Sequence, residues 1–235
     1  MPLSYTIVSI GALSRNRFWN ETDAKRPAHA TTTLVRDGST TILVDPGLPE
    51  QVLLQRLEER TGLAPDQIDM VFLTNFRPVH RRALGVFSKA SWVMHEPEIA
   101  AVREHLDQLS ASVRQDRGRG GAAGRREEQE VARMVAEERT LLDRIAPAEE
   151  KLTRRVHLFP SVGATPGSAG LLITETSRTI AIVGDAVISR DYFEAGRVYE
   201  QVYDLEAAQV AFRDTVEVAD IVIPGHDNVF FVVGR

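Results

Sequence analysis

The chain has 235 residues, of which 43% are hydrophobic and 26% charged, a balance typical of a globular protein able to bury a sizeable core. Its formal net charge of −5 argues against a general nucleic-acid binder, because phosphate contacts need clustered Lys and Arg. There is no cysteine, so disulfides and thiolate ligands are excluded, and any metal site must use His and carboxylate ligands.

The N-terminal residues show no targeting signal. No basic segment precedes a long apolar core, so we expect no signal peptide. No apolar stretch approaches the ~20 residues that a membrane span needs. We therefore expect a cytoplasmic protein that does not contact membranes.

The first part of the chain combines short β-rich runs with one helical segment. The polar residues 15–27 contain Phe18 and Trp19, and predict either a loop near a pocket or interface or a packed surface loop. Asp37-Gly38 lies between two β-rich runs and is a strong hairpin signal. Residues 49–61 have helical spacing, and Gly62 follows where a helix should stop. Strands are predicted at residues 5–10, 31–36, 40–44, 70–74 and 91–94.

Residues 98–152 differ from the rest because they are charged and helically periodic. Their apolar residues form two stripes, separated by residues 117–124 (RGRGGAAG), which are too glycine-rich to be helical. This pattern predicts a helical hairpin with a flexible tip. The stripes are longer than internal pairing requires, so we expect a homo-oligomer, such as a dimer, formed through the hairpin. The alternative is a lid packed over its own domain.

Strands return after the insertion. They are predicted at residues 156–159, 170–174, 179–183 and 221–223, with a helix at 205–218. Strand clusters with interleaved helices on both sides of the insertion predict one α/β domain over residues 1–235, with 98–152 inserted.

Four segments, in order, resemble motifs of the metallo-β-lactamase superfamily. Residues 40–47 (TTILVDPG) resemble an early strand ending in Asp and Gly. Residues 73–80 (LTNFRPVH) align with the Thr-His-x-His-x-Asp-His motif, and residues 163–168 (GATPGS) with Gly-His-Thr-Pro-Gly-Ser. The fourth segment is a pair, residues 183–186 (VGDA) and 224–227 (PGHD), which resemble a Gly-Asp strand end and a final Gly-His. The resemblance implies a four-layer α/β/β/α sandwich with the active site at one sheet edge.

The resemblance also implies two adjacent metal sites, since members of this family bind metals that activate water for hydrolysis. The first site would use the positions of Asn75, Arg77 and Ala164. None of these residues has an imidazole, so we expect the first site to hold no metal. Arg77 moreover carries a fixed positive charge, which would repel a dication by roughly 4 kcal/mol at 4 Å and moderate dielectric. We expect Arg77 to form an ion pair with Asp185 in place of the missing cation.

The second metal site is better preserved. It would use the positions of Val79, His80, Asp185 and His226, and the last three of these can still bind one Zn²⁺ or Fe²⁺ ion. The alternative is that the two His and the Asp are structural and no metal binds.

Other polar residues have weaker signals. Asp45 resembles a structural position of the family, and Asp227 a loop or cap residue. His29 is predicted either to face the site from the first hairpin or to be a satisfied core residue. We expect surface or structural roles for His95, His105 and His157.

Two functions remain open. One is a pseudoenzyme with hydrolase-like fold that is inactive or weakly active as a two-metal hydrolase and binds a small molecule or a protein. The other is a mononuclear metal-dependent hydrolase of a small ester, thioester, lactone or phosphoester that uses His80, Asp185 and His226. The sequence assigns no further catalytic residue.

Overall fold

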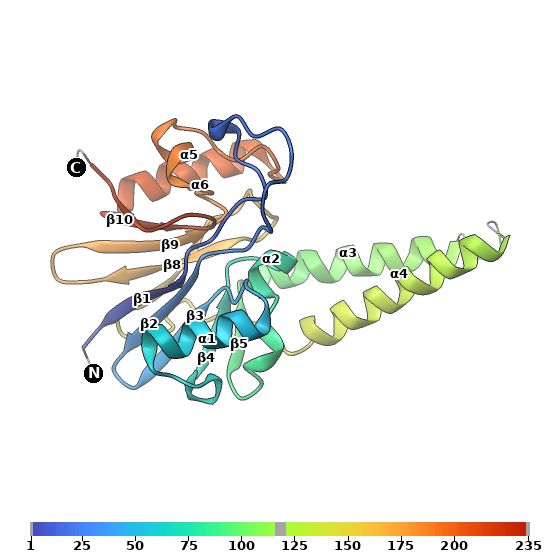
Figure 1. Ribbon diagram of the computed structural model, residues 1–235, viewed down its shortest axis with the longest axis horizontal. Helices are drawn as coiled ribbons and strands as arrows, with labels where there is room; N and C mark the ends of the chain where they lie inside the picture. Colours follow the sequence, from blue (N-terminus) through green and yellow to red (C-terminus); the bar gives the residue numbers. More distant parts are fainter. Residues whose placement is uncertain (1, 116–120, 234–235) are drawn as a thin grey trace.

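Short apolar runs build two β-sheets that face each other (Figure 1). The computed structural model describes residues 2–115 and 121–233. The first sheet has the order β1-β2-β3-β4-β5-β6, and the second has the order β11-β10-β9-β8-β7. The strands of the first sheet are β1 Ser4–Ser9, β2 Thr32–Asp37, β3 Thr40–Val44, β4 Met70–Leu73, β5 Ser91–Met94 and β6 Ile145–Pro147. Those of the second are β7 Val156–Pro160, β8 Ala169–Thr174, β9 Thr179–Gly184, β10 Ile221–Pro224 and β11 Phe230–Phe231.

Helices cover the outer face of each sheet, so that α6 lies at the top of Figure 1 and α1 at the bottom. The described α-helices are α1 Glu50–Thr61, α2 Pro78–Arg81, α3 Glu96–Gln115, α4 Gly121–Leu142, α5 Arg190–Glu194 and α6 Leu205–Val218. Short 3-10 turns lie at Arg17–Trp19, Pro65–Gln67 and Leu84–Val86. The result is the predicted α/β/β/α sandwich. No helix in the described ranges is long and apolar enough to cross a membrane.

Three apolar layers hold the sandwich together. The layer between the sheets includes Phe72 from β4 and Leu171 and Ile182 from β8 and β9. A second layer packs α1 and the hairpin helices on the first sheet, and a third packs α6 on the second sheet. Buried apolar side chains on both faces of the central strands explain why these strands read as continuous apolar runs rather than as alternating ones.

The helical insertion is confirmed as a hairpin, and α3 and α4 extend far beyond the sandwich (Figure 1). It ends earlier than the sequence suggests, because Ile145 begins β6 and pairs with Trp92 of β5. The prediction that residues 117–124 are too glycine-rich for a helix is wrong for residues 121–124, which open α4. Residues 117–120 lie outside the described residues. Burial of the apolar face against α3 is the main source of helix stability, and it outweighs the low helix propensity of glycine.

The two apolar stripes of the hairpin pack against each other. Ile99 and Leu106 of α3 are buried together with Val135 and Leu142 of α4. Among the hairpin side chains that the structure describes, Met134 is the one large apolar side chain that is exposed, at 46%. Most of the apolar surface that suggested an interface is therefore used within the hairpin.

Self-association through the hairpin stays a prediction, and light scattering at micromolar concentration tests it. If α3 and α4 form the contact, Met134→Glu should shift a dimeric mass toward the monomer, because a charge at an apolar contact is costly. The matched control is Val52→Glu on the exposed side of α1. A monomeric mass for the unchanged protein would count against the prediction.

A polar contact joins the end of β2 in the first sheet to the segment just before β7 in the second sheet. The Asp37 carboxylate at the end of β2 accepts hydrogen bonds from Thr153 Oγ1 and from the backbone and guanidinium of Arg155, just before β7. Burial by itself would raise the pKa of Asp37. The hydrogen bonds from Thr153 and Arg155 and the charge of Arg155 instead hold it below its ordinary value.

We expect Asp37→Asn to lower the free energy of unfolding by about 2 kcal/mol at neutral pH, because it removes hydrogen bonds to a charged group. A depressed carboxyl pKa stabilises the fold above the unfolded pKa of about 3.9, and this stabilisation is lost as pH falls through the folded-state pKa. The deficit of the variant should therefore shrink below about pH 4. Urea unfolding of both proteins at several pH values measures this difference in the free energy of unfolding. Asp66→Asn, which removes an exposed ion pair with Lys89, should cost far less.

Candidate functional site

The carboxyl ends of four strands deliver the polar side chains of the site to one edge of the sandwich. β3 and β4 run parallel in one sheet, as do β9 and β10 in the other. Asp45 follows β3, Asn75 lies just after β4, Asp185 follows β9 and His226 lies just after β10. Parallel neighbours end at the same edge, so residues far apart in the sequence meet there.

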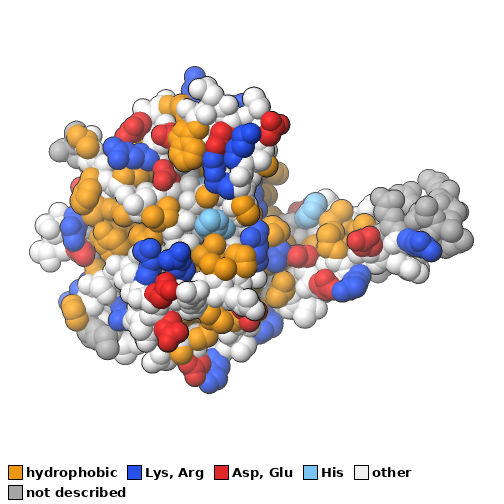
Figure 2. All heavy atoms as spheres, in the orientation of Figure 1, with side chains coloured by type: hydrophobic (Ala, Val, Ile, Leu, Met, Phe, Trp, Pro, Cys, Tyr) orange, Lys and Arg blue, Asp and Glu red, His pale blue; other side chains and the backbone are white. Residues whose placement is uncertain are grey.

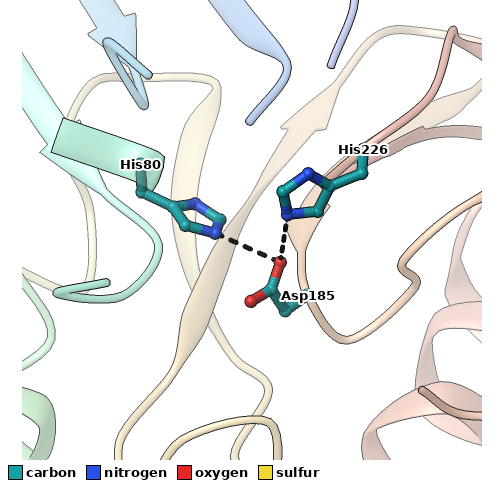
Figure 3. A group of neighbouring side chains, drawn as sticks. All are labelled: His80, Asp185 and His226. Atoms are coloured by element: carbon teal, nitrogen blue, oxygen red, sulfur yellow. Dashed lines mark hydrogen bonds and ion pairs between the residues drawn. The ribbon is translucent and has the colours of Figure 1, made fainter. Parts of the chain in front are cut away.

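Two histidines converge on one oxygen of a buried carboxylate (Figure 3). Nε2 of His80 lies 3.1 Å from Asp185 Oδ1, and Nε2 of His226 lies 3.2 Å from the same atom. The two rings are perpendicular, with centroids 5.5 Å apart. All three residues are buried, and their ligand atoms lie within 4.8 Å of one another. The structure thus brings together the three residues that the resemblance assigns to the second metal site.

Hydrogen bonds at Nδ1 fix the orientation of the His80 ring. Its Nδ1 lies 2.9 Å from Oδ2 of Asp45, a carboxylate oxygen that can only accept. Asp45 is itself held by Thr74, whose backbone N and Oγ1 both donate to it. The φ of Asp45 is 51°, in the left-handed region that costs energy for a residue with a side chain. The expected structural role of Asp45 is therefore to orient His80.

The His226 ring is fixed by backbone carbonyls. Its Nδ1 lies 3.0 Å from the carbonyl oxygen of His29 and 3.2 Å from that of Ala12. Carboxylate and carbonyl oxygens can only accept hydrogen bonds. The Nδ1 atoms of His80 and His226, which face such oxygens, must therefore carry the hydrogen. In neutral rings both Nε2 lone pairs then face the Asp185 oxygen. Three acceptors meet at one point, and this arrangement is stable only with a proton or a cation between them.

Arg77 neutralises the other oxygen of Asp185, as the sequence predicted. Its Nη1 donates to Asp185 Oδ2 at 2.7 Å, and its Nη2 donates to the carbonyls of Ala164 and Gln201 at 2.8 and 3.0 Å. The guanidinium does not pair with both carboxylate oxygens, because Oδ1 already faces the two imidazoles. The Arg77 side chain remains 33% exposed, whereas that of Asp185 is 2% exposed.

Asn75 completes the cluster. It is fully buried, and its Nδ2 donates to Asp185 Oδ2 at 3.4 Å and lies 3.2 Å from Nε2 of His80. Its Oδ1 accepts from the backbone N of Arg77, so the short turn that carries Arg77 is tied to the same group.

The charges of this cluster shift the pKa values of His80 and Asp185. Burial by itself would lower the pKa of His80, but the negative charges of Asp185 and Asp45 and the hydrogen bonds to them raise it to about 10. Burial would raise the pKa of Asp185, whereas the charge of His80 and the hydrogen bonds from both imidazoles hold it well below its ordinary value. A negatively charged Asp185 is thus stabilised by its neighbours.

The remaining predicted positions supply no ligand. The carbonyl of Val79 accepts from Ala30, and its side chain has no donor atom for a metal. Ala164 is buried and offers only its carbonyl, which Arg77 uses. The ring of His29 lies against the carbonyls of Ile10 and Pro27, so only its backbone contacts the cluster, through His226. His95 is structural, because its Nδ1 lies 2.8 Å from the carbonyl of Gly167.

Glu98 is a site-supporting residue that the sequence did not reveal. It is 2% exposed at the start of α3, and its carboxylate accepts from the backbone N of Phe76 and Gly167 and from Thr165 Oγ1. It therefore ties the two loops that carry Asn75, Arg77 and Ala164. In the sequence, Glu98 looks like any Glu near the N-terminus of a helix. Its partners are mainly backbone groups distant in the chain, so no sequence pattern marks them.

A second contact links the hairpin to the site. Arg81, next to His80, donates from Nε to the carbonyl of Phe76 and forms an ion pair with Glu138 of α4. Glu138 interrupts the apolar stripe of α4, and its ion pair with Arg81 explains why a charged residue stands there.

The model of the metallo-beta-lactamase superfamily matches residues 26–226, and the chain therefore belongs to this family. No curated protein sequence matches it.

Solved structures share the fold at low identity. A putative metallo-beta-lactamase from Thermotoga maritima is 19% identical with a TM-score of 0.65, covering 97% of this chain and 99% of that one. AidC, a dizinc quorum-quenching lactonase in complex with a product, is 16% identical with a TM-score of 0.63, covering 86% of this chain and 74% of that one. An AiiA variant from B. thuringiensis with N-decanoyl-L-homoserine bound at its active site is 17% identical with a TM-score of 0.63, covering 96% of this chain and 92% of that one. These likenesses show the fold.

The residues of this site fit one metal ion and do not fit two. His80, Asp185 and His226 are a suitable donor set, and both imidazoles present Nε2 while Nδ1 is held by an acceptor, as in many metal sites. The first metal site of the family would instead include the position of Arg77. The guanidinium of Arg77 is hydrogen-bonded to Asp185 and to two backbone carbonyls. A guanidinium cannot lose its proton to become a ligand, so a two-metal centre does not fit this chain.

We expect Glu98→Gln to reduce the free energy of unfolding by about 2 kcal/mol. The NH₂ group of Gln would face hydrogen-bond donors that now donate to a carboxylate oxygen, and two donors cannot pair with each other. Urea unfolding monitors the loss. Glu104→Gln is the matched control, since Glu104 is exposed further along α3. Equal stability of the two variants would mean that Glu98 does not hold the loops together.

Proposed function

We propose that this chain is a small-molecule-binding member of the metallo-β-lactamase superfamily that does not work as a two-metal hydrolase. The observation that carries the proposal is the ion pair of Arg77 with Asp185, with 2.7 Å between Nη1 and Oδ2. Arg77 stands at a position where the family resemblance would put a ligand of the first metal ion. It neutralises a buried carboxylate without supplying a Lewis acid.

Arg77 also supplies a group that could bind a ligand. Its side chain is one-third exposed and anchored at both Nη atoms, so the guanidinium is a rigid positive group at the edge of the cluster. A fixed guanidinium loses little conformational entropy when it binds a carbonyl or an anionic oxygen. Small molecules with such oxygens are therefore the ligands that we propose for this site.

A mononuclear hydrolase is the second candidate, and the geometry of the two imidazoles favours it. Their Nδ1 hydrogens are committed, so His80, Asp185 and His226 would hold a divalent ion such as Zn²⁺ or Fe²⁺ through Nε2 and Oδ1. When bound, such an ion would polarise a substrate oxygen and activate water. Asp45 would orient His80, and Arg77 would bind an oxygen of the substrate. The lactonases among the similar structures put lactones among the candidate substrates.

Metal analysis separates the two candidates. After equilibration with Zn²⁺ or Fe²⁺ and removal of free ions, we expect the unchanged protein to keep clearly less than one ion per chain. Arg77→His with Val79→Asp and Ala164→His should raise Zn²⁺ affinity by at least about 100-fold, because it adds ligands and removes a repulsion of roughly 4 kcal/mol. Arg77→Lys, which keeps the charge, is the matched control and should not gain affinity.

Retention of one ion by the unchanged protein, together with lactone hydrolysis that disappears in His226→Ala, would overturn the first candidate and support the second. Arg77→His alone should not create activity, since Val79 and Ala164 still lack donor side chains. Lactone hydrolysis by that single variant would contradict the assignment of the first site.

A further inference from the structure

A cavity of about 540 Å³ lies beside the cluster, between the first 3-10 turn and the segment that joins α5 to α6. Its volume is in the range of small-molecule pockets. Figure 2 shows hydrophobic and Lys or Arg side chains side by side at the top of the molecule, where Figure 1 places the 3-10 turn and α5. The lining consists of Arg17, Phe18, Tyr192, Gly196, Arg197, Val198, Glu200, Leu205 and Gln209.

The charges of the lining favour a monoanion. Arg17 lies 3.3 Å from Glu200, and the same carboxylate accepts from the hydroxyl of Tyr192. Arg197 also lines the cavity, and in the part of the chain that the structure describes no carboxylate pairs with it. Two guanidinium groups and one carboxylate leave one positive charge, which a single carboxylate of a ligand would balance.

The apolar part of the lining is unusually exposed. Phe18 and Leu205 are 41% and 58% exposed, although both are large apolar side chains. The Phe18 ring packs edge-on against Tyr192, with centroids 4.9 Å apart, which fixes its position at the wall. Exposed apolar side chains grouped at a cavity indicate that something apolar covers them.

The segment between α5 and α6 separates this cavity from the Asp185 cluster. Val198 and Glu200 line the cavity, while the next carbonyl, that of Gln201, accepts from Arg77. A ligand in the cavity would therefore contact the backbone that covers Arg77 without touching His80 or His226.

We propose that this cavity binds a small amphiphilic carboxylate. The carboxylate pairs with Arg197, and the apolar tail lies against Phe18, Val198 and Leu205. This site goes beyond the proposed function, because it does not depend on what Asp185 and its neighbours bind. A phosphate monoester fits less well, since its second negative charge would meet Glu200.

Tryptophan fluorescence of the full chain reports on this cavity. The chain has two Trp residues. Trp19 follows Phe18 and is 59% exposed, whereas Trp92 belongs to β5 of the first sheet and is 2% exposed. Titration with octanoate should shift the emission of Trp19 in a saturable way, and Trp19→Phe should remove the signal while calorimetry still detects binding.

Two variants and one analogue test the binding mode. Arg197→Gln should weaken octanoate binding by about tenfold or more, because it removes a charge-assisted pair. Leu205→Ser should weaken octanoate binding through the tail. The uncharged analogue 1-octanol should bind far more weakly than octanoate and should be insensitive to Arg197→Gln. The matched control Arg190→Gln changes an exposed Arg of α5 that pairs with Glu194 outside the cavity, and it should bind octanoate normally.

Three outcomes would overturn the proposal: octanoate that does not saturate, 1-octanol that binds as tightly as octanoate, or equal losses for Arg197→Gln and Arg190→Gln. All four substitutions, at Trp19, Arg190, Arg197 and Leu205, are at exposed positions, so the variants should fold, and circular dichroism checks this. Metal content at His80 and His226 is measured separately, so a failure here leaves the proposed function of the cluster untouched.

Discussion

The buried carboxylate of Asp185 sets the conditions for the whole site. Its side chain is 2% exposed, and an isolated charge at such a depth would be far too costly to keep. One oxygen faces the imidazoles of His80 and His226, and the other faces the guanidinium of Arg77. Each of these partners must be held in place by further contacts, and the surrounding loops are arranged to provide them.

Those contacts reach well beyond the cluster. Asp45 keeps an unfavourable left-handed backbone so that its carboxylate can orient His80. Glu98 at the start of α3 ties the loops on both sides of Arg77, and Arg81 joins the same turn to Glu138 of α4. The projecting hairpin is thus connected to the site through two buried or half-buried acidic side chains.

Replacement of a metal ligand by arginine changes what the family site can do. A dication accepts several lone pairs and activates water, whereas a guanidinium donates hydrogen bonds and neutralises one negative charge. Arg77 pairs with the buried carboxylate of Asp185, and under the proposed function this ion pair stands in for the first metal. The neighbouring cavity, with Arg197 and exposed Phe18, is the second place where we propose that a guanidinium binds an anionic ligand. Both proposals therefore rest on recognition of a small oxyanion by an arginine.

The sequence by itself determined the described strands except β6 and β11, the helical hairpin and the residues at the strand ends, because apolar periodicity and turn residues are local signals. It also placed Arg77 beside Asp185, since the family motifs fix which strand ends meet. Only the tertiary structure decided how the rings are oriented, which carbonyls hold Arg77, and that Glu98 and Glu138 support the site. It also ended the hairpin at Leu142, because Ile145 gains strand partners on β5 that its neighbours in sequence do not reveal. These contacts join backbone carbonyls and amides to distant side chains. Every residue has such groups, so their pairing leaves no mark in the sequence and appears only when the chain is folded.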